Sequence, residues 1–441
     1  MPDNGNHDSN VRRRSFLKKV GAAGTVGAAG LAGCLGGGGD GGDGDGDGGT
    51  DGGTDGGTDG GGSGIDSVKI GIATSLSGPF AVFGQAEVNG AKLAKQDLEE
   101  ELGISVDIVT ADTELSPDTG VQRMRRMVTE DNIDFGTGGV SSAVSLKMGT
   151  WASDNKVIYF ATGFSDAITG SGCAPYMFRH VSSNSMLANT IGRGMVDAAD
   201  TWYIIYSNYT WGQTAYNAVK NILESEGKTV VGASAAPFPN DDYTQFINQA
   251  QQSDAKGIGL LIAGLDLRIA INQAVAKGLH ENRKFAMHQV EDIVFWGLDK
   301  QKVRTLDVGG QLWGPGSPGG DEFKQRIADN YDTDPYVRHY VGYLSVDQGV
   351  RAAMRAGSTN ADAMRDALEG HEVQSEPVKA IKPGKMYWRE CDHQLIQPTY
   401  SVQALPTGEM QDSPYKRWFK TLKTFPGDDV ARSCEDTGCN L

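Results

Sequence analysis

The sequence contains no apolar run of the length that a membrane-spanning helix needs. A span takes about 20 predominantly apolar residues, and the apolar stretch near the N-terminus, residues 20–35, is shorter and rich in glycine. Positive charge is also scarce, because 40 Lys and Arg stand against 56 Asp and Glu, which gives a formal net charge of −16. Binding phosphates requires a basic patch, so we expect no nucleic-acid partner.

The motifs of common hydrolases are incomplete. Residues 163–167 and 139–143 approach the G-x-S-x-G turn of a nucleophilic serine, but each segment ends in alanine. The histidines form no H-E-x-x-H pair for zinc. A phosphate-binding loop ending at Lys228 and Thr229 would need glycine where Ile222 stands. We therefore expect a protein that is not an enzyme and that uses no metal and no cofactor.

The N-terminal residues predict export and lipid attachment. Arg13 and Arg14 precede the short apolar stretch, which ends in small residues and Cys34. This order is typical of a twin-arginine signal peptide closed by a lipobox, here residues 1–34. Cys34 would carry the lipid and become the mature N-terminus, on the extracellular face of the cell membrane. A single acyl chain binds a membrane only marginally, so a stable anchor implies at least two.

A low-complexity segment, residues 35–65, follows the expected anchor. It consists almost wholly of Gly, Asp and Thr, which bury too little apolar surface to offset the entropy of ordering. We expect a disordered tether with a reach of roughly 30 Å. The body, residues 66–441, is too long for one ordinary core and suits two lobes. Its acidic composition suggests adaptation to high salt, and we expect a halophilic archaeon as the source.

Four cysteines remain besides Cys34, namely Cys173, Cys391, Cys434 and Cys439. An even set outside the cell is usually paired, and four cysteines allow three connectivities. We expect a local bond between Cys434 and Cys439 and a long-range bond between Cys173 and Cys391. The competing interpretation, a zinc site, would need C-x-x-C pairs that the spacing does not supply.

Short runs rich in Val and Ile alternate with stretches of helical periodicity along the body. Such alternation predicts an α/β fold of parallel sheets covered by helices on both faces. It runs twice along the chain, which predicts two doubly wound lobes. The expected strands are residues 68–73, 106–110, 133–135, 157–161, 202–206, 229–233 and 257–262, and the expected helices are residues 87–102, 118–130, 141–154, 213–226, 244–253 and 268–277.

Three turns that follow expected strands carry hydroxyl groups and small residues. They are residues 75–79, 138–142 and 162–165. In parallel sheets, ligands bind beyond the carboxyl ends of the strands, against helix N-termini. The other interpretation is that each Ser or Thr only caps a helix, but three such turns at one edge favour a ligand site.

The sequence resembles the branched-chain-amino-acid type of solute-binding protein from ABC transporters. The likeness lies in residues 70–84 and 89–94, and it continues through residues 111–113, 178–179, 211–212 and 392–398. It implies the type I periplasmic-binding-protein fold, with lobe I formed by residues 66–182 and 313–396 and lobe II by residues 183–312 and 397–441. Three crossovers, near Val181, Gln311 and Gln397, would form the hinge.

The resemblance also implies ligand-binding residues in lobe I. Ser141 and Ser142 would bind a ligand carboxylate, and Phe83 would pack on the ligand side chain. Thr162, Gly163 and Phe164 would offer a carbonyl to the ligand's amine and further donors to its carboxylate. Phe164 departs from the family, which generally has threonine there, and the missing hydroxyl weakens the expected contact with an amine.

In lobe II, the resemblance implies aromatic residues and an acid that pairs with an ammonium group. Tyr209 and Trp211 supply the aromatic residues. The acid falls among residues 287–292, where either Gln289 or Glu291 can face the ligand. Gln289 would favour an amide, urea or uncharged ligand, because a buried ammonium without a partner is costly. Glu291 would favour an amino acid.

The expected function is the capture of a branched-chain or other small amino acid in the cleft between the lobes, by a monomer that delivers it to an ABC permease with cytoplasmic ATPases. An amide, urea or short carboxylate is the alternative ligand. A ligand-sensing receptor domain and an extracellular hydrolase are the rival classes.

Overall fold

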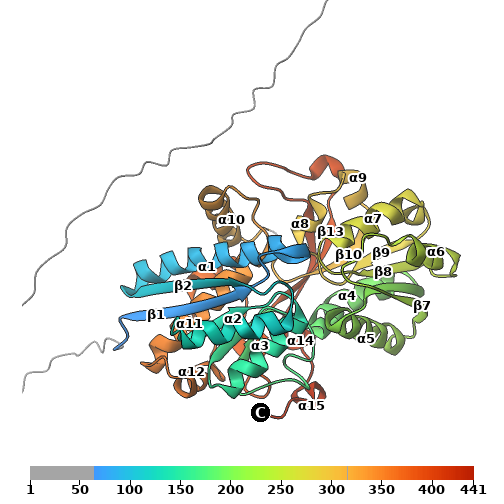
Figure 1. Ribbon diagram of the computed structural model, residues 1–441. Coiled ribbons are helices and arrows are strands. Elements are labelled where there is room, and N and C mark those ends of the chain that lie inside the picture. The colour runs from blue at the N-terminus through green and yellow to red at the C-terminus, as the bar shows by residue number, and fades with distance from the viewer. Residues whose placement is uncertain (1–63, 315) are drawn as a thin grey trace, which may run out of the picture. The chain divides into compact units, whose positions relative to one another are not determined.

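The computed structural model describes residues 64–314 and 316–441 (Figure 1). The expected signal peptide, Cys34 and residues 35–63 of the expected tether lie outside this part of the chain. Ile65, the last residue of the expected tether, is buried in the core. The ordered body therefore begins slightly earlier than the sequence suggested.

Lobe I, as the structure defines it, is built on a five-stranded parallel sheet in the order β2-β1-β3-β4-β5. Helices α2 and α3 cover one face, and α1 and α11 cover the other. Its first elements are β1 (Ser67–Thr74), η1 (Gly78–Phe80), α1 (Ala81–Leu102), β2 (Ser105–Asp112), α2 (Pro117–Thr129), β3 (Phe135–Gly138), α3 (Ser142–Asp154), β4 (Ile158–Ala161) and β5 (Met177–Arg179). Its later elements are α10 (Pro318–Tyr331), α11 (Val337–Ala356), α12 (Ala361–Leu368), α13 (Glu376–Ile381), β11 (Tyr387–Trp388) and β12 (Leu395–Ile396).

Lobe II is built on a seven-stranded sheet in the order β14-β13-β10-β9-β8-β6-β7, in which only β13 and β14 run antiparallel to their neighbours. Its elements are α4 (Asn184–Ala198), β6 (Thr201–Ser207), α5 (Thr210–Ser225), β7 (Thr229–Ala236), α6 (Thr244–Gln252), β8 (Gly257–Leu261), α7 (Asp266–Ala276), η2 (Leu279–Glu281), β9 (Lys284–Met287), α8 (Asp292–Phe295), α9 (Lys300–Val303), β10 (Leu306–Gln311), β13 (Thr399–Ala404), η3 (Thr407–Glu409) and β14 (Phe419–Phe425).

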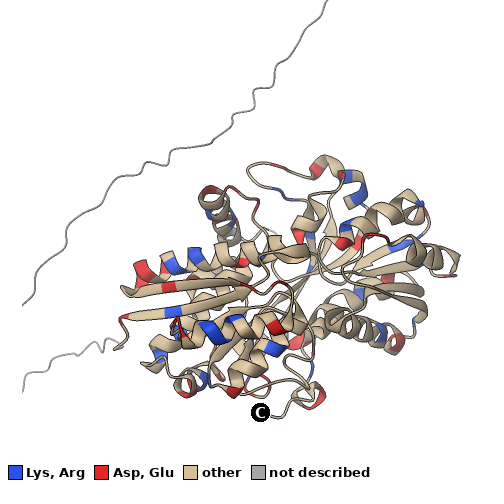
Figure 2. Cartoon of the chain, in the orientation of Figure 1, with Lys and Arg blue, Asp and Glu red and all other residues tan. Residues whose placement is uncertain are grey.

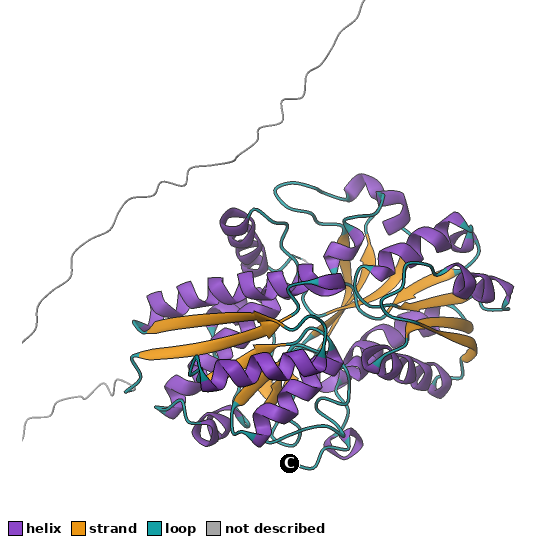
Figure 3. Cartoon of the chain, in the orientation of Figure 1, coloured by secondary structure: helices purple, strands orange, loops and turns teal. Residues whose placement is uncertain are grey.

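The predicted α/β class with two doubly wound lobes is confirmed, since helices cover both faces of each sheet (Figures 1 and 3). One local expectation was wrong. The strand expected at residues 133–135 is shifted, because β3 comprises Phe135–Gly138, and Gly136 pairs there with Gly71 and Tyr159 in the two neighbouring strands. Glycine there reflects close packing, because a Cβ on Gly136 would lie 2.7 Å from the methyl carbon of Met124.

The chain passes between the two lobes after β5, after β10 and after β12. Buried side-chain amides tie these passages together. Gln394 donates a hydrogen bond of 2.9 Å to the Val181 carbonyl, and Gln397 donates one of 2.5 Å to the His180 carbonyl. Two passages far apart in sequence therefore lie side by side, as a hinge requires. The lobe boundaries expected from the sequence remain predictions at single-residue precision.

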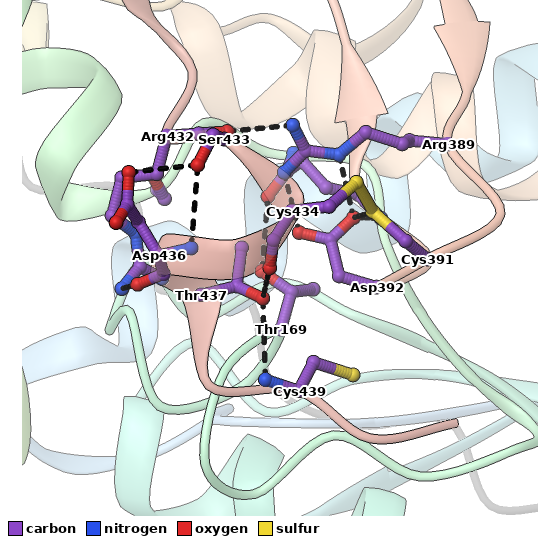
Figure 4. A network of polar contacts seen from close by, with 12 residues as sticks. Thr169, Arg389, Cys391, Asp392, Arg432, Ser433, Cys434, Asp436, Thr437 and Cys439 are labelled. Carbon is purple, nitrogen blue, oxygen red and sulfur yellow. Dashed lines mark hydrogen bonds and ion pairs between the residues drawn. A yellow bond between two sulfur atoms is a disulfide. The ribbon is translucent and has the colours of Figure 1, made fainter.

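The disulfide pairing expected from the sequence was wrong. Cys173 is bonded to Cys439, and Cys391 is bonded to Cys434. Helix α15 (Cys434–Thr437) separates Cys434 from Cys439, and the Ser433 hydroxyl caps it (Figure 4). A local bond between Cys434 and Cys439 would have required Cys173 to pair with Cys391, whereas both Cys173 and Cys391 are bonded to cysteines of the C-terminal segment.

This C-terminal segment, residues 426–441, also differs from its expected place in lobe II. Helix α14 (Gly427–Val430) packs against α4 of lobe II, and Asn189 donates a 2.7 Å hydrogen bond to the Val430 carbonyl. Beyond it, the Arg389 guanidinium donates to the Arg432 carbonyl, and both disulfides join lobe I. The segment is therefore a fourth connection between the lobes.

Charged side chains lie mainly on helices and connecting loops, while the strands of both sheets are mostly uncharged (Figure 2). Within residues 64–314 and 316–441, no helix combines the length and the apolar character that crossing a bilayer demands.

We predict that the double variant Cys173→Ser and Cys439→Ser lowers the free energy of unfolding by about 3 kcal/mol, because the bond closes a long loop in the unfolded chain. Guanidinium unfolding of the oxidised variant and the oxidised wild type would measure the difference. Reduction of the wild type should lower it further, since that breaks both bonds. An unchanged unfolding midpoint in the double variant would contradict the expectation.

Candidate functional site

A closed pocket lies where the two lobes meet, at the carboxyl ends of parallel strands. In lobe I, the segments that follow β1, β3 and β4 reach it, and in lobe II those that follow β6, β8 and β9 do so. Its volume is about 30 Å³, roughly the share of one water molecule in the liquid. An organic solute can therefore enter only when the lobes separate. The lining residues are Phe80, Phe83, Val140, Phe164, Tyr209, Trp211, Ile262, Ala263, Gly264, Leu267, Gln289, Glu291, Val294 and Arg338.

Aromatic rings form a continuous stack across the two lobes. Phe80 lies 5.6 Å from Phe83 in its own lobe and 5.1 Å from Phe238 in lobe II, and Tyr209 lies 5.1 Å from Phe238 on the other side. Gly264 makes this approach possible, because a Cβ there would lie 2.7 Å from the Phe80 ring. The stack gives the cleft apolar walls that suit an aliphatic or aromatic ligand.

The polar centre of the pocket is a buried group of three charged side chains, Glu87, Arg338 and Glu291, which we call the charge triad. Arg338 donates from Nη1 to Glu87 Oε1 at 3.0 Å and to the Thr162 carbonyl at 3.2 Å, and from Nε to Glu291 Oε1 at 2.8 Å. The three residues are 1%, 3% and 5% exposed, in the order Glu87, Arg338, Glu291. Since Arg338 lies in lobe I and Glu291 in lobe II, the triad joins the lobes.

Close helix packing brings two triad members together. Helices α1 and α11 touch at Gly90 and Gly342, where a Cβ would lie within 2 Å of the His339 and Glu87 carbonyl oxygens, respectively. This contact places Glu87 of α1 beside Arg338 in the first turn of α11. Thr74 at the end of β1 donates a 2.8 Å hydrogen bond to the second oxygen of Glu87, so both oxygens of this buried carboxyl are bonded.

Burial and charge act in opposite directions on the triad. Burial raises the pKa of Glu87, and the opposing charge of Arg338 does not fully offset that effect. Burial alone would lower the pKa of Arg338, but the charges of Glu291 and Glu87 outweigh it and raise that pKa. Arg338 is therefore always charged, while Glu87 takes up a proton more readily than an exposed glutamate does.

Two polar groups of the triad have no protein partner among the described residues. Glu291 Oε2 is buried without a hydrogen bond, and the bonds of Arg338 all come from Nε and Nη1, which leaves Nη2 unused. Gln289, in contrast, donates to Glu291 at 2.6 Å and accepts from the Trp211 indole at 3.1 Å. Within the triad, the polar groups left for a ligand are thus one carboxylate oxygen and one guanidinium amino group.

The pocket brings together six of the ten ligand-binding residues expected from the sequence, namely Phe83, Phe164, Tyr209, Trp211, Gln289 and Glu291. The other four are outside its lining. Ser141 occupies the N-cap position of α3 without a side-chain hydrogen bond to the helix, and Ser142 accepts a 3.1 Å hydrogen bond from the Ser165 amide. Thr162 accepts one of 2.9 Å from the Val140 amide, and Gly163 lies against the Ser142 backbone. Ligand contact by any of the ten remains a prediction.

Sequence reasoning missed Arg338 and Glu87. Both carried a signal, because each is a charged residue on an otherwise apolar helix face. Arg338 lies within the aromatic and apolar run 336–344, and Glu87 shares its face with Ala91, Ala94 and Leu98. A lone charge on a buried face needs a partner, but only the fold shows that the two are partners.

Two α/β lobes joined by several passages of the chain, with a closed pocket between them, define a hinged solute-binding protein. The sequence pattern of the periplasmic binding protein family matches residues 67–409, and the chain belongs to that family. This confirms the type I periplasmic-binding-protein fold.

Known relatives agree with this assignment. A crystal structure of a periplasmic binding protein from Burkholderia mallei is 26% identical, with a TM-score of 0.79, and the match covers 85% of this chain and 99% of that one. A Leu/Ile/Val-binding protein of Rhizobium johnstonii is 25% identical over 42% of this chain, and the match spans only 47%, about half, of that relative's length. A solute-binding protein of Rhodopseudomonas palustris, solved with 3,4-dihydroxybenzoic acid, is 17% identical with a TM-score of 0.71 and coverages of 84% and 99%, so it shows the shared fold.

We predict that Arg338→Leu lowers the free energy of unfolding by about 3 kcal/mol, because it leaves buried carboxyl groups without their cation. Urea unfolding followed by tryptophan fluorescence would measure the loss. The matched control is the triple variant Arg338→Leu, Glu87→Gln and Glu291→Gln, which removes the unpaired charges and should recover most of the stability. Equal losses in the single and triple variants would show that packing, not charge, stabilises this position.

The ring of the buried His288 donates a 2.9 Å hydrogen bond from Nε2 to the Asn184 carbonyl. Burial lowers the pKa of His288 to about 4, whereas in the unfolded chain it is near 6.5. Its contribution to stability is therefore complete above pH 6.5 and is lost as the pH falls toward 4. Between pH 7 and pH 5, we expect His288→Gln to lose about 2 kcal/mol less unfolding free energy than the wild type.

Unfolding curves of both proteins at pH 7 and pH 5 would test the prediction for His288. Between pH 7 and pH 8 the variant and the wild type should show the same pH dependence. Equal losses at pH 5 would mean that His288 is protonated in the folded protein.

Proposed function

We propose that this protein is the solute-binding component of an ABC importer and that it closes on a small organic carboxylate with an apolar or aromatic body. Branched-chain and other small amino acids, which the sequence predicts, belong to this class, as do short carboxylates. The lobes enclose one solute and deliver it to a permease whose transport is driven by cytoplasmic ATPases. Its role is binding, without chemical conversion.

The observation that carries the proposal is the charge triad in an aromatic-walled pocket at the lobe interface. An importer needs a site that opens to solvent and closes around its solute, and the lobes meet there with almost no space left. Arg338 Nη2 supplies N–H donors for a carboxylate, and the rings of Phe80, Phe83 and Tyr209 supply apolar contact. Water is excluded from the closed site, so each contact there gains in strength.

The relatives support the proposed class of solute, but they do not identify the particular solute. One partial relative is named a Leu/Ile/Val-binding protein, and one protein of the same fold was solved with a hydroxylated benzoic acid. The fold thus accommodates amino acids and aromatic acids. An amide or urea has less support, because Gln289, whose position suggested it, bonds Glu291 and Trp211.

The cellular setting belongs to the same proposal. We infer twin-arginine export, lipid attachment at Cys34 and a flexible tether, which together hold a monomeric binding protein at the outer face of the membrane of a halophilic organism. The paired arginines, the cysteine after small residues and the acidic composition support this.

Calorimetric titration and small-angle scattering of the purified protein test the proposed function. The panel is L-leucine, 4-methylpentanoate, benzoate, acetamide and urea. We expect at least one carboxylate-bearing solute to bind with 1:1 stoichiometry. The protein with bound solute should be compact in scattering, and the solute should be recovered unchanged.

Phe83→Ala should weaken that binding by at least about tenfold, since it removes part of the apolar wall. The matched control is Tyr216→Ala, which removes a ring that stacks on Tyr206 at 4.6 Å, away from the pocket lining. Conversion of a solute into a product, or equal effects of the two variants, would overturn the proposed function.

A further inference from the structure

The cleft contains a cation that belongs to the protein itself, the guanidinium of Arg338. Three acceptor groups surround Arg338 and could otherwise bind a positively charged group: the Glu291 carboxylate, which lines the pocket, and the Thr162 carbonyl and Glu87 carboxyl, which lie behind the lining. The Arg338 guanidinium is hydrogen-bonded to all three, at 2.8, 3.2 and 3.0 Å, respectively. A ligand therefore meets a site in which the acceptors for an ammonium group are already largely used.

We propose that Arg338 sets the ligand class of this protein, so that the preferred solute is an apolar or aromatic carboxylate that lacks an ammonium group beside its carboxylate. The inference rests on the proposed function and narrows it. It assigns Arg338 as a specificity-determining residue that binds the carboxylate through Nη2 and excludes an amine by its own charge.

Electrostatic repulsion by Arg338 opposes an ammonium group in this site. An ammonium group that approached Thr162 or Glu291 would lie beside the guanidinium, within the reach of the same acceptors. Arg338 is 3% exposed, and like charges repel strongly where water does not screen them. An amino acid would have to displace Arg338 from its partners, whereas the corresponding carboxylate would not.

The guanidinium of Arg338 is also held in a fixed position that suits a carboxylate. Arg338 lies 5.4 Å from the Phe83 ring and 5.1 Å from the Phe164 ring, so two aromatic side chains and three acceptors fix its position. Its Nη2 amino group carries two N–H donors that no described residue uses. A fixed planar donor group of this kind suits a carboxylate.

Another feature of lobe I favours the same charge on the ligand. Helix α3, which has 13 residues, begins at Ser142, two residues after Val140 of the pocket lining, and no side chain caps its first amides. The positive end of that helix adds to Arg338 in favouring an anion.

The rest of the pocket describes the body of the ligand. Phe80, Phe83, Tyr209 and Trp211 form apolar walls from both lobes, and stacked rings favour a flat or branched apolar group. Glu291 Oε2 remains as an acceptor for a neutral donor, such as a hydroxyl group on the ligand or a water molecule. An aromatic carboxylate, with or without a hydroxyl group, satisfies each of these features.

The test uses matched probes that differ only in charge. Calorimetric titration of the full protein would compare L-phenylalanine, 3-phenylpropanoate and 2-phenylethylamine, then L-leucine, 4-methylpentanoate and 3-methylbutylamine. We expect the carboxylate of each set to bind at least about tenfold more tightly than the amino acid, and the amine to bind weakest. Benzoate and 4-hydroxybenzoate extend the series to the aromatic acids.

Two variants separate a role in specificity from a role in folding. Arg338→Met should reverse the order, weakening the carboxylates by about 100-fold and strengthening the amines, because it frees the acceptors. Arg338→Lys should retain the preference for carboxylates at reduced affinity. Glu291→Gln, which keeps the fold of lobe I intact, should strengthen carboxylate binding by removing a negative charge.

The outcomes distinguish this inference from the proposed function. Two results would overturn the inference but leave a solute-binding protein. One is tighter binding of the amino acids than of their deaminated analogues, and the other is binding of acetamide or urea alone. Unchanged probe order in Arg338→Met also overturns it. Absence of binding and of compaction with every probe overturns both.

Discussion

The closed structure depends on how one buried guanidinium is neutralised. Arg338 is removed from water by the meeting of the lobes, and a charge in that position is tolerated only because Glu87, Glu291 and the Thr162 carbonyl surround it. Two of these partners belong to lobe I and remain with Arg338 when the lobes part. Glu291 belongs to lobe II, so separation of the lobes returns it to solvent. The triad therefore links the charge state of the cleft to its closure, and a ligand that meets Arg338 takes part in the same balance.

Parallel strands explain why these groups meet at all. Each lobe presents the carboxyl ends of its strands to the other, and the segments that follow them carry short polar or aromatic stretches. Phe80 and Phe83 follow β1, Phe164 follows β4, and Glu291 follows β9. The segments that carry these residues need not be long, because the edges of the sheets already lie beside the pocket and the side chains extend from there into it. The buried amides of Gln394 and Gln397 keep the neighbouring passages of the chain together.

The sequence predicted those features that depend on local periodicity. Alternating strands and helices gave both lobes. The resemblance to a known family, not the periodicity, pointed to Phe83, Phe164, Tyr209, Trp211, Gln289 and Glu291, all of which line the pocket. The sequence did not predict Arg338, because residue 338 enters the site through a contact between α1 and α11 that are about 250 residues apart in the chain. The disulfide pairing failed for a similar reason, since spacing favours the local pair Cys434 and Cys439, while the backbone of α15 directs each cysteine to a different partner.

The C-terminal segment makes the order of synthesis matter. Cys173 and Cys391 lie in lobe I, but their partners follow lobe II in the sequence, at positions 439 and 434. Neither bond can form until residues 434 and 439 have been translated, after both lobes. A chain that stopped before Cys434 would carry two free thiols in lobe I, so the two native bonds mark a molecule whose C-terminal segment has reached lobe I.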